Sequence, residues 1–105
     1  MKSISSVILK SKLDAGERPR LLDVREVWEY DLCNIKESIN ISMSNVEKIQ
    51  NEFDLDDEII VICHHGMRSL QVASYLVSKN YSNVTNLEGG VDAWAKFIDS
   101  TMAQY

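Results

Sequence analysis

The stretch of sequence that decides the fold is IIVICHHGMRS, residues 59–69. Its first four residues, Ile59 to Ile62, form an unbroken β-branched run, which is typical of a strand buried on both faces of a parallel sheet. Gly66 permits a tight turn, and apolar residues at helical spacing follow it. The stretch therefore predicts a strand, a short loop and a helix, with Cys63 where the strand ends.

Other apolar runs alternate with segments of helical periodicity along the chain. This alternation predicts an α/β domain on a mostly parallel sheet. We expect strands at 2–4, 21–24, 39–41, 59–62 and 84–87. We expect helices at 5–13, 26–32 and 44–53, one from the Cys63 loop to about residue 80, and one over 91–98 after a Gly89-Gly90 turn. The predicted fold class is a three-layer α/β domain with four or five parallel strands between helices.

Three details of these helices are specific enough to be checked. Ser44 and Glu47 have the spacing of a capping box, so they should begin the helix at 44–53. Trp28 and Trp94 stand at helical spacing with apolar neighbours and should be packing residues. The helix after Cys63 should bury one face, made of Leu70, Ala73, Leu76 and Val77.

Composition limits the class of protein. The chain has 105 residues, 45% of them apolar, which is enough for one core, so residues 1–105 are expected to form a single domain. A net charge of −5 provides no basic field for nucleic acid or anionic lipid. The apolar run at 7–9 is too short for an export signal or a membrane span. We therefore expect a cytoplasmic protein with free thiols, no nucleic-acid partner and no membrane association.

The position predicted for Cys63 suits a reactive thiol. Open α/β sheets bind ligands at the carboxyl edge of their strands. A short loop that wraps back toward the sulfur can aim several backbone N–H groups at it, and the amino terminus of the next helix adds partial positive charge. Both effects, together with Arg68, favour the thiolate, which is the nucleophilic form of cysteine.

The loop CHHGMRS, residues 63–69, resembles the active-site loop of rhodanese-like domains. LLDVREVWEY at 21–30 is similar to the opening strand and turn of that family, and NLEGGVDAWAKF at 86–97 resembles its closing strand, glycine turn and helix. The segments occur in family order, so the resemblance extends from Leu21 to Phe97. It implies a sulfurtransferase that needs no cofactor and carries sulfur as a persulfide on Cys63.

The same resemblance implies roles for individual residues and for partners. Cys63 is the nucleophile, Asp23 and Arg25 support the site, and Arg68 braces the loop or meets the donor anion. The donor is a small sulfane sulfur compound such as thiosulfate, and the acceptor is a thiol, cyanide or a protein. The substrate-binding loop consists of His64, His65, Gly66, Met67, Arg68 and Ser69.

The stretch YDLCNIKES at 30–38 departs from the family pattern. Cys33 and Asn34 replace a Gly-His pair, and Glu37 and Ser38 replace a Gly-Ala pair. We expect this stretch to lie on the rim of the site and to affect the choice of donor or acceptor. Cys33 is expected to be structural or incidental, with redox sensing or persulfide relay as the alternatives.

Three other functions stay open at this stage. Adjacent His64 and His65 beside a cysteine suggest a metal site, but neighbouring turn residues point apart and no further ligand motif exists, so no metal is predicted. A cysteine phosphatase or arsenate reductase uses a similar loop with one residue more between Cys and Arg, whereas four residues separate Cys63 from Arg68 here. A non-catalytic binding module of the same fold would usually have lost Cys63.

Overall fold

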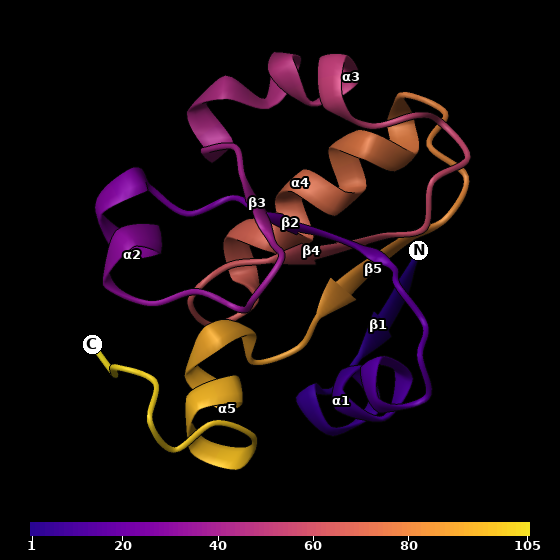
Figure 1. Cartoon of the computed structure of the whole chain (residues 1–105). Helices are drawn as coiled ribbons and strands as arrows, with labels where there is room; N and C mark the ends of the chain where they lie inside the picture. The colour runs from indigo at the N-terminus through magenta and orange to yellow at the C-terminus, as the bar shows by residue number, and fades with distance from the viewer.

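The structure is a computed structural model that describes residues 1–105, and its centre is a five-stranded parallel sheet (Figure 1). The strand order is β1-β5-β4-β2-β3, so β4 lies in the middle. The strands are β1 Lys2–Ile4, β2 Arg20–Asp23, β3 Ile39–Asn40, β4 Ile59–Ile62 and β5 Val84–Leu87. The predicted α/β class is confirmed, and the five predicted strands all occur within one residue of their expected bounds.

Helices cover both faces of this sheet. The helices are α1 Ser6–Asp14, α2 Val27–Leu32, the 3₁₀ helix η1 Met43–Lys48, α3 Ile49–Glu52, α4 Met67–Ser78 and α5 Gly90–Phe97. In Figure 1, α3 and α4 lie on one side of the sheet, and α1 and α5 lie on the other. None of these helices is long and apolar enough to cross a membrane.

The middle strand β4 shows why its sequence has no polar position. Ile59 and Val61 pack in one apolar cluster with α4 residues, while Ile60 and Ile62 pack in a second cluster with Leu9, Val91 and Trp94. Alternate residues of a strand point to opposite faces, so a strand covered on both sides must be apolar throughout. This packing fixes Cys63 at the carboxyl edge, directly after Ile62.

The helix predicted at 44–53 is wrong as one element. The chain forms η1 and then α3, with a non-helical residue at Asn45 (φ −120°, ψ 32°). The predicted capping box is also wrong, because Ser42 is the cap and its side chain accepts a hydrogen bond from the Ser44 N–H at 3.4 Å. The chain leaves β3 and bends at once, so helical structure begins before Ser44.

Two packing predictions need correction. In α4 the buried face consists of Ser69, Val72, Ala73 and Leu76, whereas Leu70 and Val77 are exposed. Trp94 is buried as predicted, but Trp28 is 63% exposed. Trp28 lies in the short helix α2. Its ring packs edge-on against the ring of Tyr105, with ring centres 5.9 Å apart, and not against the core.

Candidate functional site

Cys63 follows β4 and precedes a short loop that leads into α4. The residue is 1% exposed, and its Sγ accepts a hydrogen bond from the Gly66 N–H at 3.0 Å. The thiol donates to Ser69 Oγ at 3.3 Å, and the Ser69 hydroxyl donates to Asn86 Oδ1 at 2.5 Å. The sulfur therefore lies inside its own loop, in contact with one backbone amide and one hydroxyl.

Gly66 has the backbone conformation that this loop requires. Its φ is +107°, a region that side chains other than glycine rarely adopt. The turn brings the Gly66 N–H toward the sulfur, and the Gly66 carbonyl accepts a hydrogen bond from Asn86 Nδ2 at 3.3 Å. Asn86 on β5 thus holds both the turn and Ser69, and this residue was missed by sequence reasoning. Its signal was a polar residue inside the buried strand VTNL.

The amino terminus of α5 holds the other side of the loop. The N–H groups of Val91 and Asp92 donate to the carbonyls of Cys63 and His64 at 2.9 and 3.0 Å. Gly90 lies so close that a Cβ there would be 2.2 Å from the Cys63 oxygen. The C=O and N–H of a trans peptide point in opposite directions, so the amides of His64 and His65 point away from α5.

Asp23 and Arg25 form a buried ion pair beside the site. Arg25 Nη2 and Asp23 Oδ2 are 2.7 Å apart, and both side chains are fully buried. Burial lowers the pKa of the Arg25 guanidinium, but its hydrogen bonds to Asp23 and Tyr105 outweigh this effect and raise the pKa above its ordinary value. Asp23 ends β2, the strand next to β4. The pair therefore supports the edge of the sheet at which Cys63 lies.

Arg68 in the first turn of α4 is bound by Glu29 of α2. The guanidinium meets the carboxylate through two hydrogen bonds, at 2.6 and 2.8 Å. The bond to Arg68 is the main reason why the pKa of Glu29 falls to about 2, and the Tyr105 hydroxyl lowers it further. Sequence reasoning missed both partners. Glu29 had a signal as a charged residue between Trp28 and Tyr30, whereas nothing in the sequence pointed to Tyr105.

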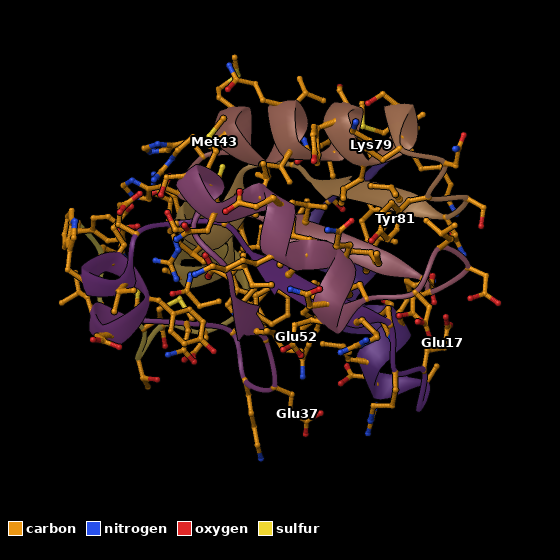
Figure 2. The ribbon with its side chains drawn as sticks, turned by 90° about the horizontal axis from the view of Figure 1, so that it is seen from above. Glu17, Glu37, Met43, Glu52, Lys79 and Tyr81 are labelled. Carbon is orange, nitrogen blue, oxygen red and sulfur yellow. The ribbon has the colours of Figure 1, made fainter.

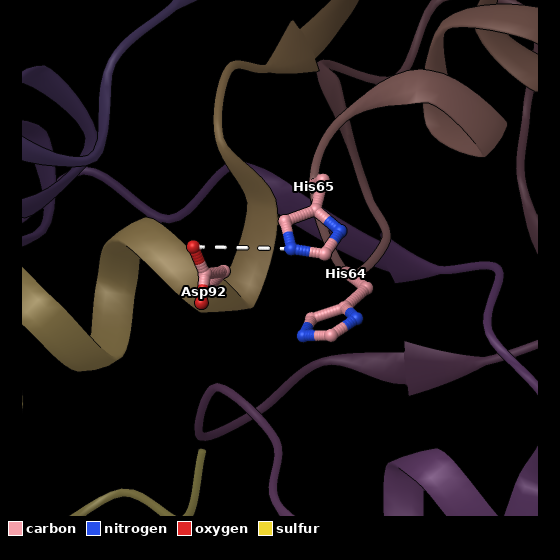
Figure 3. A group of neighbouring side chains, drawn as sticks. All are labelled: His64, His65 and Asp92. Carbon is pink, nitrogen blue, oxygen red and sulfur yellow. Dashed lines mark ion pairs between the residues drawn. The ribbon is translucent and has the colours of Figure 1, made fainter. Parts of the chain in front are cut away.

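The side chains of His64 and His65 project out of the loop on the side of Asp92 in α5, as Figure 3 shows. Their ligand atoms and that of Asp92 all lie within 4.8 Å of one another. The two imidazoles stack, with ring centres 3.9 Å apart and planes at 34°. Asp92, the one carboxylate of this group, is already paired with Lys96 at 3.0 Å. The absence of a metal stays a prediction.

The predicted loop residues have different surroundings. Cys63, Gly66 and Ser69 meet at the sulfur, and Arg68 binds Glu29. Met67 is 70% exposed at the start of α4. The cavities of the structure, about 160–360 Å³ each, are lined by other residues. The site therefore consists of polar groups close to one sulfur atom and is not one of the cavities.

The prediction that residues 30–38 form the rim of the site is correct only in part. The Cys33 carbonyl accepts a hydrogen bond from Arg25 Nη2 at 2.6 Å, so Cys33 lies near the supporting ion pair. Glu37 and Ser38, however, precede β3 and lie at the amino edge of the sheet, opposite Cys63. In Figure 2, Glu37 extends from the body on this loop, far from Met43 beyond the other end of β3.

Comparisons with known proteins agree with this geometry. The family model of the rhodanese-like domain matches residues 6–97. A putative sulfurtransferase, YtwF of Bacillus subtilis, is 38% identical over 94 residues, which are 90% of each chain. The thiosulfate sulfurtransferase GlpE of Pseudomonas syringae is 32% identical over 74 residues, 70% of each chain. A rhodanese-like domain protein of Staphylococcus aureus superposes with a TM-score of 0.82 and 32% identity, covering 90% of this chain and 91% of that one.

The chain therefore belongs to the rhodanese-like domain family. At the level of the family it is a sulfurtransferase, as the names of these relatives indicate. The fold and the family predicted from the sequence are both confirmed.

Proposed function

We propose that this protein transfers a sulfane sulfur from a donor such as thiosulfate to a thiophilic acceptor through a persulfide on Cys63. The observation that carries the proposal is the hydrogen bond of 3.0 Å from the Gly66 N–H to Sγ, at the amino terminus of α4. A backbone donor and a helix amino terminus both stabilise negative charge on sulfur. They favour the thiolate before the reaction and the persulfide anion after it.

In the first step the Cys63 thiolate attacks the outer sulfur of thiosulfate. A new S–S bond forms, the S–S bond of thiosulfate breaks, and sulfite leaves with the electron pair. The negative charge then resides on the outer sulfur of the persulfide. Such covalent catalysis divides one difficult transfer into two easier ones.

In the second step an acceptor nucleophile attacks the outer sulfur. With cyanide the product is thiocyanate, and with a thiol it is a new persulfide. The S–S bond at Cys63 breaks, and the electron pair returns to Cys63 as thiolate. A protein thiol would react in the same way, so all three acceptor classes use one mechanism.

The donors for the outer sulfur are backbone amides. The amides of His64 and His65 point away from α5, and those of Met67, Arg68 and Ser69 belong to the first turn of α4, where no intrahelical acceptor exists. We assign Arg68 a bracing role, because Glu29 binds its guanidinium through two hydrogen bonds. A donor anion would thus be held mainly by amides and the helix terminus.

Intact-mass spectrometry after incubation with thiosulfate tests this proposal. We expect the purified protein to gain the mass of one sulfur atom and to lose it on mild reduction. Cys63→Ser should gain nothing, because oxygen cannot form the persulfide, while Cys33→Ser should gain the sulfur normally. Loading of Cys63→Ser, or no loading of the folded wild type by any sulfane sulfur donor, would refute the proposal.

The cellular location of the reaction also stays a prediction. Both cysteines are free in the structure, as a reducing compartment would keep them. We therefore retain the cytoplasm as the proposed location. Free thiols can be trapped in intact cells before fractionation. Detection of the native protein with trapped thiols in the cytoplasmic fraction would support both the location and the reduced state of the cysteines.

A further inference from the structure

Tyr105 lies against the Cys63 loop although it is far from it in the sequence. Its ring stacks on His64, with ring centres 3.8 Å apart and planes at 6°. Trp28 of α2 meets the same ring edge-on at 5.9 Å. In Figure 1 the segment after α5 turns back toward α2. Three separate segments thus place aromatic rings together beside the loop.

The hydroxyl of Tyr105 is also held at both of its hydrogen-bonding positions. It accepts a hydrogen bond from Arg25 Nη1 at 2.9 Å and donates one to Glu29 Oε2 at 2.8 Å. Burial raises the pKa of Tyr105 to about 12, so the hydroxyl keeps the proton that it donates. Glu29 in turn binds Arg68. The ring on His64 is therefore anchored to the charged groups that support the site.

Different groups hold the ring of His64 and its backbone. The backbone is held by α5, because the Asp92 N–H donates to the His64 carbonyl at 3.0 Å. The ring lies between His65 and Tyr105. Loss of Tyr105 would therefore release the ring and leave the backbone of the loop in place.

Several charged groups face the His64 ring. His65 comes from the loop and Asp92 from α5, while Glu29 comes from α2 and Arg25 from the segment between β2 and α2. Burial is the largest influence and lowers the pKa of His64, His65 lowers it further, and the two carboxylates oppose this shift. The ring is thus held in its neutral form at neutral pH.

We propose that Tyr105 is a positioning residue, which holds the His64 ring as a fixed aromatic wall beside the Cys63 loop and thereby strengthens binding of the sulfur donor. The inference rests on the proposed function, because the donor is the substrate of that reaction. A His64 ring that is already fixed loses little conformational entropy when the donor binds, so the donor binds more strongly than it would to a mobile ring. The backbone amides that serve the reacting sulfur do not depend on Tyr105.

The test compares Tyr105→Leu with Tyr105→Phe, which keeps the ring and loses only the hydroxyl. Phe97→Leu is the matched control, because it removes an aromatic ring that is 72% exposed on α5. Steady-state kinetics with thiosulfate at about pH 8 keep the His64 imidazole neutral, so a change in KM reports the position of this ring and not its charge. The KM should rise about fivefold in Tyr105→Leu, the scale of one lost aromatic pair, with kcat within about twofold of wild type. Phe97→Leu should stay near the wild-type KM, and Tyr105→Phe, which keeps the ring but loses the two hydrogen bonds that anchor it, should have a KM between those of wild type and Tyr105→Leu.

An NMR titration of the imidazoles gives a readout that needs no activity. The chain has only two histidines, and His65→Ala assigns their signals. The pKa of His64 should rise toward its ordinary value in Tyr105→Leu, because the ring loses its cover, and stay lowered in Tyr105→Phe. This titration decides whether Tyr105 holds the ring even if no variant transfers sulfur, in which case the proposed function alone fails.

Three results would overturn the inference. An unchanged His64 titration in Tyr105→Leu would show that Tyr105 does not hold the ring. A lower KM in that variant would show that the ring obstructs the donor. A fall in kcat at constant KM would mean that Tyr105 acts on the reacting loop itself.

Discussion

The two cysteines of this protein are both buried, yet their backbone surroundings are opposite. Cys63 precedes the amino terminus of the twelve-residue helix α4, and its sulfur accepts a hydrogen bond from Gly66. Cys33 follows the carboxyl terminus of the six-residue helix α2, where its own N–H donates to the Glu29 carbonyl. Its sulfur accepts a hydrogen bond of 3.8 Å from the Arg25 guanidinium and none from a backbone amide.

This comparison shows that burial does not decide which thiol reacts. Cys63 is 1% exposed and Cys33 is 8% exposed, so the proposed nucleophile is the more buried one. Helix amino termini carry partial positive charge and carboxyl termini carry partial negative charge. The direction of the neighbouring helix, and the amides that it leaves free, therefore set the surroundings of Cys63 apart from those of Cys33.

A longer loop should lower the reactivity of Cys63 in sulfur transfer. Inserting one glycine after Gly66 moves several amides away from the sulfur, and loss of one preorganised donor alone typically costs about 10² to 10³ in rate. We expect thiosulfate-dependent sulfur transfer to fall by about two orders of magnitude and weak hydrolysis of an aryl phosphate to appear. Steady-state kinetics with both substrates provide the measurement, after circular dichroism has shown that the variant is folded.

The control for this change is a glycine inserted after Gly16, which lies in open space between α1 and β2. That insertion should leave sulfur transfer near the wild-type rate. Undiminished transfer after the insertion at Gly66 would show that loop length does not select the reaction. The phosphatase interpretation would then gain support.

The rates of alkylation test the comparison directly. We expect iodoacetamide to modify Cys63 in the Cys33→Ser variant at least about tenfold faster than Cys33 in the Cys63→Ser variant at neutral pH, because the thiolate is the reactive form. Mass spectrometry of timed samples gives both rates, and the two variants in urea give the intrinsic rates as a control. Equal rates in the folded variants would contradict the helix-direction argument.

The sequence predicted the elements whose cause is local. Ile59 to Ile62 have no polar residue, so the central strand and the position of Cys63 at its end followed from pattern alone. Asp23 and Arg25 came from the family resemblance, and the structure places them as a buried pair. The capping box at Ser44 failed because helical structure already begins at Met43, with Ser42 as its cap.

The contacts that the sequence did not predict join residues far apart along the chain. Asn86 on β5 accepts a hydrogen bond from Ser69 on α4, and Tyr105 donates one to Glu29, which is far from it in the sequence. No periodicity or spacing rule reports such pairs. Trp28 was predicted to be a packing residue but is 63% exposed, because helical spacing shows which residues share a face and not what covers that face.

Gly90 sharpens the comparison, because it lies directly against the carbonyl groups of the Cys63 loop. In Gly90→Ala the new Cβ would lie 2.2 Å from the Cys63 oxygen and 2.5 Å from the His64 oxygen, at a φ of +55°. We expect the loop to shift, with sulfur transfer reduced about tenfold and a loss of about 3 kcal/mol in the free energy of unfolding. Gly16→Ala, with φ +88° and no atom within 4 Å, should lose only the backbone strain, about 1 kcal/mol. Similar losses in the two variants, measured by urea unfolding, would show that the contact with the loop is unimportant.

Glu29 connects the two cysteine regions, and its titration gives the smallest expected effect. Its carbonyl accepts the Cys33 N–H, and its carboxylate binds Arg68 of the Cys63 loop. The bond to Arg68 lowers the pKa of Glu29 from 4.5 to about 2. The unfolded chain therefore binds the proton more readily, so this carboxylate stabilises the fold above about pH 4.5, and the stabilisation is lost as the pH falls toward 2.

Other carboxyl groups titrate over the same range, so wild type must be compared with Glu29→Gln, in which only this group is absent. Urea unfolding should show wild type more stable at about pH 6, and the difference should shrink by on the order of 2 kcal/mol by about pH 3. A difference that stays constant over this range would mean that the Glu29–Arg68 pair does not hold α2 against the loop, and Cys63 would then owe its surroundings to α4 and α5 alone.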